Sequence, residues 1–314
     1  MEDNQIKAFE GLKDVGQAEA IISKIKVDFP GDDNKVDETL DDLLAALDES
    51  KPLIGDADDF HNFAVSISKT LNDNAKACFI VQQGLEIHPY NSDFLADALR
   101  YGYSSGEKEK CVGWYNTLQS IDKSRWTWRA FSFSIDYLLN QWISSNQNDY
   151  SIDDILNLVK QYQETIPYKE DAWLCEFDVY EGTNQREKGV AVLKEAIQRF
   201  EYCPRCCLRY ADILIYNGNF EKAEPIIEKM RKNPKTSEAI NISYMYFLDA
   251  QCKYARLNKT DDEEEQNKLV RNIYRSFRKA LSSHGLRAAN SSQIEQYIEE
   301  LEIDYDIFYP AEWR

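Results

Sequence analysis

Glycine and proline are scarce in this 314-residue chain, which contains 12 and 8 of them. Histidine is scarcer still, and none of the three residues, His61, His88 and His284, is spaced with a second ligand as a metal site requires. The glycine-rich phosphate loop, the nucleophile elbow and the zinc-protease motif are all absent. We therefore expect no catalytic centre, no bound metal and no cofactor.

Long apolar runs are also missing, since no stretch reaches the roughly 18 uninterrupted apolar residues that a membrane helix requires. The first residues have neither the basic start nor the apolar run of a secretion signal. The seven cysteines are an odd number, and reduced thiols are the simplest account of them. These features predict a cytoplasmic protein with no membrane partner.

Positive charge is in deficit, with 37 Lys and Arg against 55 Asp and Glu and a formal net charge of −18. Proteins dedicated to nucleic acids or anionic membranes neutralise phosphate with Lys and Arg, so this balance argues against both as direct ligands. The deficit is largest in residues 1–60, which hold 17 acidic and 6 basic side chains. This segment is either a solvated cap or a region that steers a basic partner.

Apolar residues recur at helical spacing almost throughout the chain. Val192, Leu193, Ala196 and Phe200 fall on one helix face, and runs of period two are hard to find. The few Gly and Pro residues separate these helical segments. The pattern predicts an all-α chain of antiparallel helix pairs.

Corresponding positions recur every 34 residues. Trp173 aligns with Cys207 at this offset, and Leu193 with Ile227. The longer gap that precedes them fits one unit with a ten-residue insertion near residues 144–151. A fixed period of this length indicates a repeat protein.

The repeat resembles the tetratricopeptide repeat family, most clearly over residues 58–235. Trp173, Leu174 and Tyr180 match the pattern of the first helix, and Ala196 matches the alanine of the second. The resemblance implies a right-handed α-solenoid of roughly seven antiparallel helix pairs. We predict three regions: an acidic N-terminal helical cap at 1–57, a repeat array at 58–283, and a C-terminal capping helix with an aromatic tail at 284–314.

The predicted array consists of successive helix pairs with short turns between them. Its expected pairs cover 58–91, 92–124, 125–169, 170–203 and 204–235, followed by helices at 236–257 and 266–283 that the acidic run Asp261–Glu265 separates. An earlier pair is expected near 4–29 and 36–49, and a last helix at 291–302.

Two local clusters have both a chemical and a structural interpretation. Cys203 and Cys206 form a CxxC pattern that could serve redox chemistry or half of a zinc site. No second ligand pair is available, so we favour small buried side chains that pack between helices. The basic row Lys268, Arg271, Arg275, Arg278 and Lys279 lies on one helix face and could contact phosphate. We favour its neutralisation by Asp261–Glu265 within the chain.

The resemblance also implies that the first helices of the pairs line an inner groove that binds a partner. The groove residues it indicates are Asp171, Asp178, Glu181, Arg205, Asp212 and Tyr216, together with Arg100 and Tyr103 in the N-terminal half. The basic clamp that some family members use for a peptide carboxylate is not reproduced. An acidic groove with aromatic residues fits a basic or amphipathic segment, and solvated helix faces are the alternative.

These observations predict a non-enzymatic scaffold or adaptor that presents a concave groove to a partner protein or peptide. The alternative is a regulatory or sensor subunit of a larger, nucleic-acid-associated complex that uses the basic helix 268–279.

Overall fold

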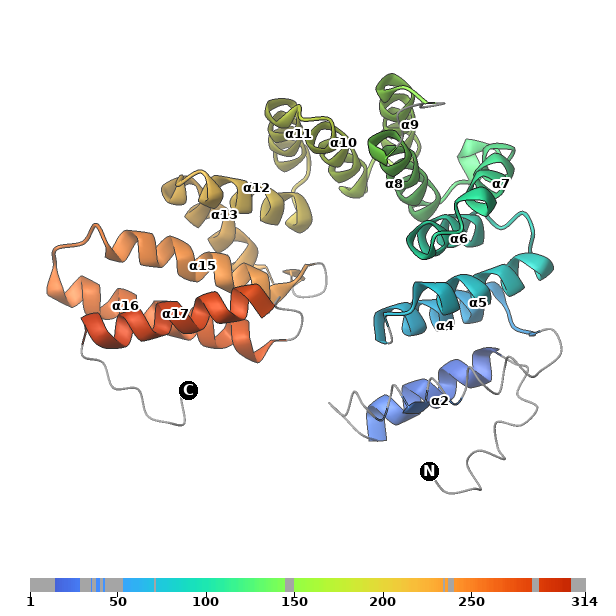
Figure 1. The fold of residues 1–314 in the computed structure, drawn as a ribbon. Coiled ribbons are helices and arrows are strands. Elements are labelled where there is room, and N and C mark those ends of the chain that lie inside the picture. Colours follow the sequence, from blue (N-terminus) through green and yellow to red (C-terminus); the bar gives the residue numbers. More distant parts are fainter. Residues whose placement is uncertain are drawn as a thin grey trace. The chain divides into compact units, whose positions relative to one another are not determined.

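The computed structural model describes residues 15–28, 35, 38–39, 42, 53–70, 72–144, 150–233, 235–236, 240–283 and 288–305. Helices and turns account for this part of the chain, and it contains no β-strand (Figure 1). The predicted all-α fold is therefore confirmed. The chain forms two compact units, Met1–Cys175 and Glu176–Arg314.

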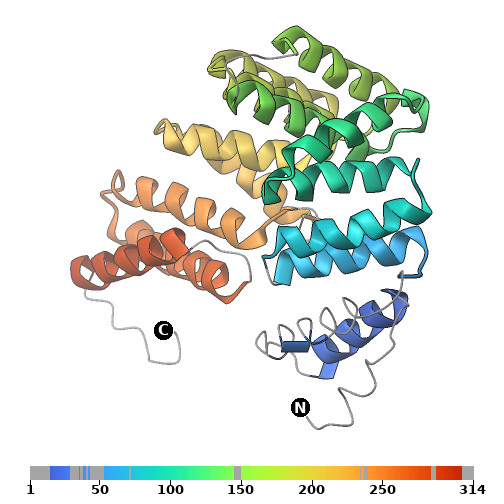
Figure 2. The ribbon, with the colours of Figure 1, turned by 45° about the vertical axis from the view of Figure 1, so that its right-hand side comes forward.

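The elements of unit 1 are α2 (Val15–Asp28), α4 (Ala57–Thr70), α5 (Asn74–Ile87), α6 (Ser92–Ser105), α7 (Lys108–Gln119), the 3-10 turn η1 (Lys123–Arg125), α8 (Trp128–Ser144) and α9 (Ile152–Thr165). The helices α2, α4, α5, α6 and α7 each pack on the next, and α8 packs on α9, as in an α-solenoid. The first helices of successive pairs also touch, because α6 packs on both α4 and α8. Figure 2 shows these helices from a second side.

Unit 2 starts inside α10 and continues the same succession of pairs. Its elements are α10 (Asp171–Gly182), α11 (Arg186–Arg199), α12 (Pro204–Tyr216), α13 (Phe220–Lys232), α15 (Ile242–Leu257), α16 (Glu263–Ser282) and α17 (Ala288–Asp304). Here α12 packs on α11, α13 and α15, and α16 packs on α15 and α17. Helices occur at each of the six predicted pairs from residue 58 to 283.

Some predictions fall on residues outside the described ranges. They include most of the expected helix 36–49, the centre of the insertion at 145–149 and the aromatic tail from 306 onward. The expected helix 4–29 is described from Val15 to Asp28, as α2. The expected last helix at 291–302 lies within α17.

The acidic run Asp261–Glu265 differs from its prediction, because three of its residues are helical. α16 begins at Glu263, and the Asp262 side chain accepts a hydrogen bond of 2.7 Å from the backbone N–H of Glu265. An aspartate at this position satisfies an N–H group that the helix itself leaves unpaired. The glutamates of the first turn also interact favourably with the helix dipole. Asp261 and Asp262 therefore lie between α15 and α16, as predicted, and Glu263–Glu265 form the first turn of α16.

The close approach of α6 and α7 depends on Gly102. A Cβ atom at this position would lie 2.5 Å from the Trp114 ring and 3.2 Å from the Cys111 sulfur. The absence of a side chain allows both α7 residues to pack directly on the α6 backbone. Gly102 thus determines how near α6 lies to its pair partner.

Trp173 provides a test of repeat packing, because only 3% of its surface is exposed. We expect Trp173→Ala to lower the free energy of unfolding by about 3–5 kcal/mol through loss of buried area and the resulting cavity. Chemical denaturation followed by circular dichroism measures this loss. Tyr168→Ala is the control, since Tyr168 is 75% exposed, and a similar loss in both variants would contradict the prediction.

Candidate binding surface

A hollow of about 150 Å³ lies between α6 and α8 in unit 1. Its lining combines aromatic and polar side chains: Leu99, Arg100, Tyr103, Ser104, Phe133, Asp136, Tyr137 and Asn140. Arg100 and Tyr103 are two of the predicted groove residues, and the structure brings them together here. The α8 residues of the lining were not predicted.

Arg100 lies over the aromatic wall of this hollow. Its guanidinium carbon is 5.1 Å from the centre of the Phe133 ring and 5.4 Å from that of Tyr101. Such stacking holds a cation over a ring face while its N–H groups stay available to a ligand. Arg100 is exposed, so these donors can reach a carbonyl or carboxylate of a bound molecule.

Two tyrosines complete the wall. The Tyr103 and Tyr137 rings meet edge to face, with their centres 6.0 Å apart, and the Tyr103 hydroxyl lies 3.2 Å from Ser144 Oγ. Burial raises the pKa of Tyr137 to about 12, so its hydroxyl is neutral at physiological pH. The hollow therefore offers an apolar interior with polar groups at its rim, which suits one amphipathic side chain.

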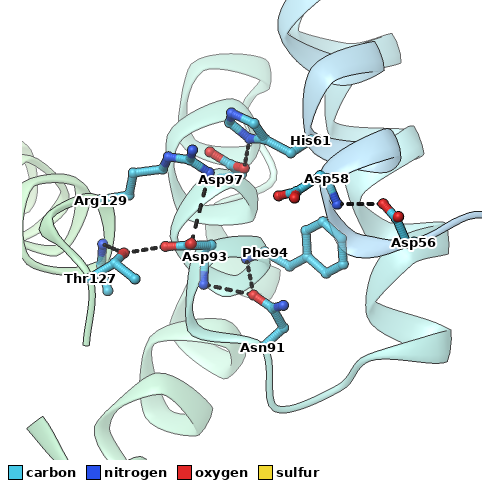
Figure 3. Close-up of polar contacts among 10 residues, drawn as sticks. Asp56, Asp58, His61, Asn91, Asp93, Phe94, Asp97, Thr127 and Arg129 are labelled. Atoms are coloured by element: carbon cyan, nitrogen blue, oxygen red, sulfur yellow. Dashed lines mark hydrogen bonds and ion pairs between the residues drawn. The ribbon is translucent and has the colours of Figure 1, made fainter. Parts of the chain in front are cut away.

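A polar cluster joins the same first helices beside the hollow (Figure 3). His61 Nδ1 on α4 lies 2.6 Å from Asp97 Oδ2 on α6, and the Asp97 side chain is fully buried. Asp93, one turn earlier on α6, accepts a hydrogen bond from the Thr127 hydroxyl and lies 3.8 Å from Arg129 Nη1 on α8. These contacts link α4, α6 and α8 through charged groups.

The pair of His61 and Asp97 resembles the orienting half of a catalytic dyad. With Nδ1–H donated to the carboxylate, Nε2 is the remaining acceptor of the imidazole. Nucleophilic catalysis also needs a hydroxyl or thiol in contact with the base. In the part of the chain that the structure describes, no Ser, Thr or Cys side chain hydrogen-bonds His61. The pair can orient the ring and accept one ligand hydrogen bond.

The contact between His61 and Asp97 was missed by the sequence analysis. The two residues lie 36 positions apart, so nothing local joins them. One signal in the sequence could have indicated this contact. His61 lies in the first helix of one predicted pair, and Asp97 lies at the corresponding turn of the first helix of the next pair.

Substitution of Asp97 tests this contact. Asp97→Ala leaves the N–H of His61, whose side chain is 16% exposed, without its acceptor, so we expect a loss of about 1–3 kcal/mol in unfolding free energy. Asp97→Asn retains an oxygen acceptor, and we expect a smaller loss. Urea titration measures both, with the exposed Asp58→Ala as control. Equal losses at positions 97 and 58 would show that the contact contributes nothing.

In unit 2 the predicted acidic residues have partners within the chain. Asp178 Oδ1 is 3.9 Å from Arg209 Nη2, and its side chain is 45% exposed. Partial burial raises the pKa of the Asp178 carboxyl, and the charges of Arg209 and Arg205 oppose this rise. Asp212 accepts a hydrogen bond of 2.8 Å from the Tyr244 hydroxyl. Both carboxylates are therefore partly compensated.

The other predicted residues of the C-terminal half have separate surroundings. Tyr216 is 78% exposed, and the Arg186 guanidinium lies 5.2 Å from its ring centre. Glu181 and Arg205 are exposed, and both act electrostatically on Asp178. Asp171 is half-buried in the first turn of α10. The structure thus joins Asp178, Glu181 and Arg205, whereas Asp212 contacts α15.

The cysteines are buried, and none of the seven forms a disulfide. Cys203 Sγ and Cys207 Sγ lie 3.9 Å apart at the start of α12. Among the described residues no group of three His, Cys, Asp or Glu side chains is arranged to hold a metal ion. A search of the same residues finds no helix with the length and hydropathy to span a bilayer.

The successive helix pairs form an all-α helical repeat fold. No protein-family model and no curated protein matches the chain. Among solved structures it is similar to a tetratricopeptide repeat protein from Parabacteroides merdae, with 15% identity, coverage of 90% of this chain and 99% of that one, and a TM-score of 0.49.

Two further solved structures show a weaker likeness. The human IFIT1 dimer with m7Gppp-AAAA has 12% identity, coverage of 94% of this chain and 74% of that one, and a TM-score of 0.45. Naa15/Naa10 bound to HypK-THB has 12% identity, coverage of 93% and 42%, and a TM-score of 0.33. At these levels of similarity, function has to be inferred from the residues of this chain.

Proposed function

We propose that this helical repeat protein is a non-enzymatic scaffold that binds a segment of a partner protein on the first helices of unit 1. The observation that supports the proposal is the hollow between α6 and α8, where Arg100 and Tyr103 meet aromatic side chains of α8. Concave sites of mixed aromatic and polar lining are typical of ligand recognition.

The lining indicates the chemistry of the bound segment. Phe133 and Tyr137 would cover an apolar side chain, and the Arg100 guanidinium would bind a backbone carbonyl or a carboxylate. Asp136, which is exposed at the rim, would bind a basic group of the same segment. An amphipathic peptide with a basic residue near its apolar anchor could make all three contacts: with the aromatic rings, with Arg100 and with Asp136.

The proposal involves no reaction step. The His61 and Asp97 pair has no nucleophile in hydrogen-bond contact within the described residues, and it serves here as a link between α4 and α6. A cytoplasmic location and an adaptor role remain predictions from the sequence.

Affinity purification with cross-linking mass spectrometry would identify the partner, and variants would then test the surface. We expect Arg100→Ala with Tyr103→Ala to weaken partner binding about tenfold or more, which corresponds to roughly 1.4 kcal/mol or more. Arg231→Ala with Tyr168→Ala is the matched control, because both residues are exposed outside the hollow. Equal binding by the two double variants would refute the proposal.

The predicted acidic groove of unit 2 has its own test. Asp178 and Asp212 already contact Arg209 and Tyr244, so we expect Asp178→Lys with Asp212→Lys to slow association of the same partner by less than about threefold. Glu187→Lys with Glu195→Lys gives the same charge change on exposed positions of α11. A far larger effect of the first pair in stopped-flow measurements would locate the binding surface in unit 2.

A further inference from the structure

α16 exposes a row of basic side chains along one face. Lys268, Arg271 and Arg275 are all exposed and follow one another at helical spacings of three and four residues. At 1.5 Å per residue the row is about 10 Å long. The opposite face of the helix is apolar and buried against the rest of unit 2.

Two acids of the run that was expected to neutralise this row have partners elsewhere in the unit. Asp262 caps the helix by accepting the N–H of Glu265, and the Glu265 carboxylate is paired with Arg256 of α15. Within the described residues, Lys268, Arg271 and Arg275 form no ion pair. Three cations are therefore left to solvent on one helix.

The C-terminal end of the original five-residue row is different. Lys279 lies 5.0 Å from the centre of the Tyr246 ring on α15, so it already has a contact within the unit. The part of the row that can bind a ligand is therefore Lys268, Arg271 and Arg275.

These three side chains line a broad open hollow on the surface of unit 2. Asn267 and Asn272 belong to the same lining and offer amide donors and acceptors. Asp262, Glu263 and Glu264 line the N-terminal end of the same hollow. The surface is thus bipolar, with carboxylates at one end and cations at the other.

We propose that this face binds an acidic segment of a partner protein, with carboxylates paired to Lys268, Arg271 and Arg275. The arginine fork matches a carboxylate through two parallel hydrogen bonds. A polypeptide can also carry a basic residue next to its acidic residues. That basic residue would then pair with Glu263 or Glu264 at the N-terminal end of the hollow.

A nucleic acid fits this surface less well. Its backbone is negative throughout, so phosphates that extend past Lys268 would meet Glu263 and Glu264. The chain as a whole also repels a long polyanion, because its formal net charge is −18. The bipolar charge distribution therefore favours a peptide of mixed sign.

This inference is independent of the proposed function. The α16 face belongs to unit 2, whereas the hollow between α6 and α8 belongs to unit 1. Variants on α16 leave Arg100 and Tyr103 unchanged, so failure at one surface can be distinguished from failure at the other.

Fluorescence anisotropy of the full chain with a labelled synthetic peptide tests the inference. The peptide has 16 residues, with glutamates at helical spacing in one half and lysines in the other. We expect it to bind the wild-type chain, with K268E/R271E/R275E weakening its binding about tenfold or more. An increase in salt from 50 to 300 mM should also weaken binding, because exposed charges are screened.

The control is K229E/R231E/K232E, which changes the charge equally on exposed residues of α13 in the same unit. We expect this variant to keep the peptide affinity within about twofold of the wild type. Thermal melts followed by circular dichroism would show that both variants are folded. An equal loss of peptide affinity in the two variants would show that binding depends only on the net charge of the chain. That result would overturn the inference.

Other occupants would give different results. Tighter binding of a 20-nucleotide single-stranded RNA than of the peptide, lost in the α16 variant alone, would identify a nucleic-acid site. Sedimentation of the wild type as a dimer and of the α16 variant as a monomer would identify a second copy of the chain. Either result, or absence of peptide binding to the wild type, overturns the inference.

Discussion

Every helix in the described part of this chain has an apolar stripe that it can bury only against a neighbouring helix. α16 shows the constraint plainly, because Leu269, Val270, Ile273 and Phe277 face inward while the opposite side is charged. Burial of such a stripe contributes about 25 cal/mol per Å² of apolar surface, far more than the charged side can contribute. Neighbours in sequence supply the cover, so the packing of each unit follows the order of the chain.

The same constraint leaves one polar side on each helix, and those sides carry the candidate sites. Contacts of α6 with both α4 and α8 place three first helices side by side in unit 1. Side chains from different repeats can then meet, as His61 does with Asp97 and Arg100 with Phe133. The proposed binding surface is thus produced by the stacking of repeats, since no single repeat contains it.

The fold could be read from the sequence because helical periodicity and turn residues are local signals. Predicted pairs such as 92–124 and 204–235 contain α6 with α7 and α12 with α13. Arg100 and Tyr103 were selected through the resemblance to a repeat family, which indicates which positions of a first helix face the inner groove. Local sequence patterns were sufficient to predict the position of a helix, because that position depends on the helix itself.

The remaining features depend on contacts between helices, and sequence spacing does not determine those. Tyr137 enters the hollow from α8, and its position follows from how α6 and α8 pack. The partners of two acids near the basic row of α16 were not predicted. Glu265 is paired with Arg256 of another helix, and Asp262 binds the backbone. The pairing of Glu265 with Arg256 depends on how α15 and α16 pack, whereas the Asp262 cap is a local contact at the start of α16.

Gly102 lies next to the proposed hollow in sequence but contacts the other helix of its pair. The residue rests against Trp114 and Cys111 of α7, whereas its neighbours Arg100 and Tyr103 line the hollow toward α8. A larger side chain at position 102 would require α6 or the Trp114 ring to shift. Position 102 can thus alter the proposed hollow without belonging to its lining.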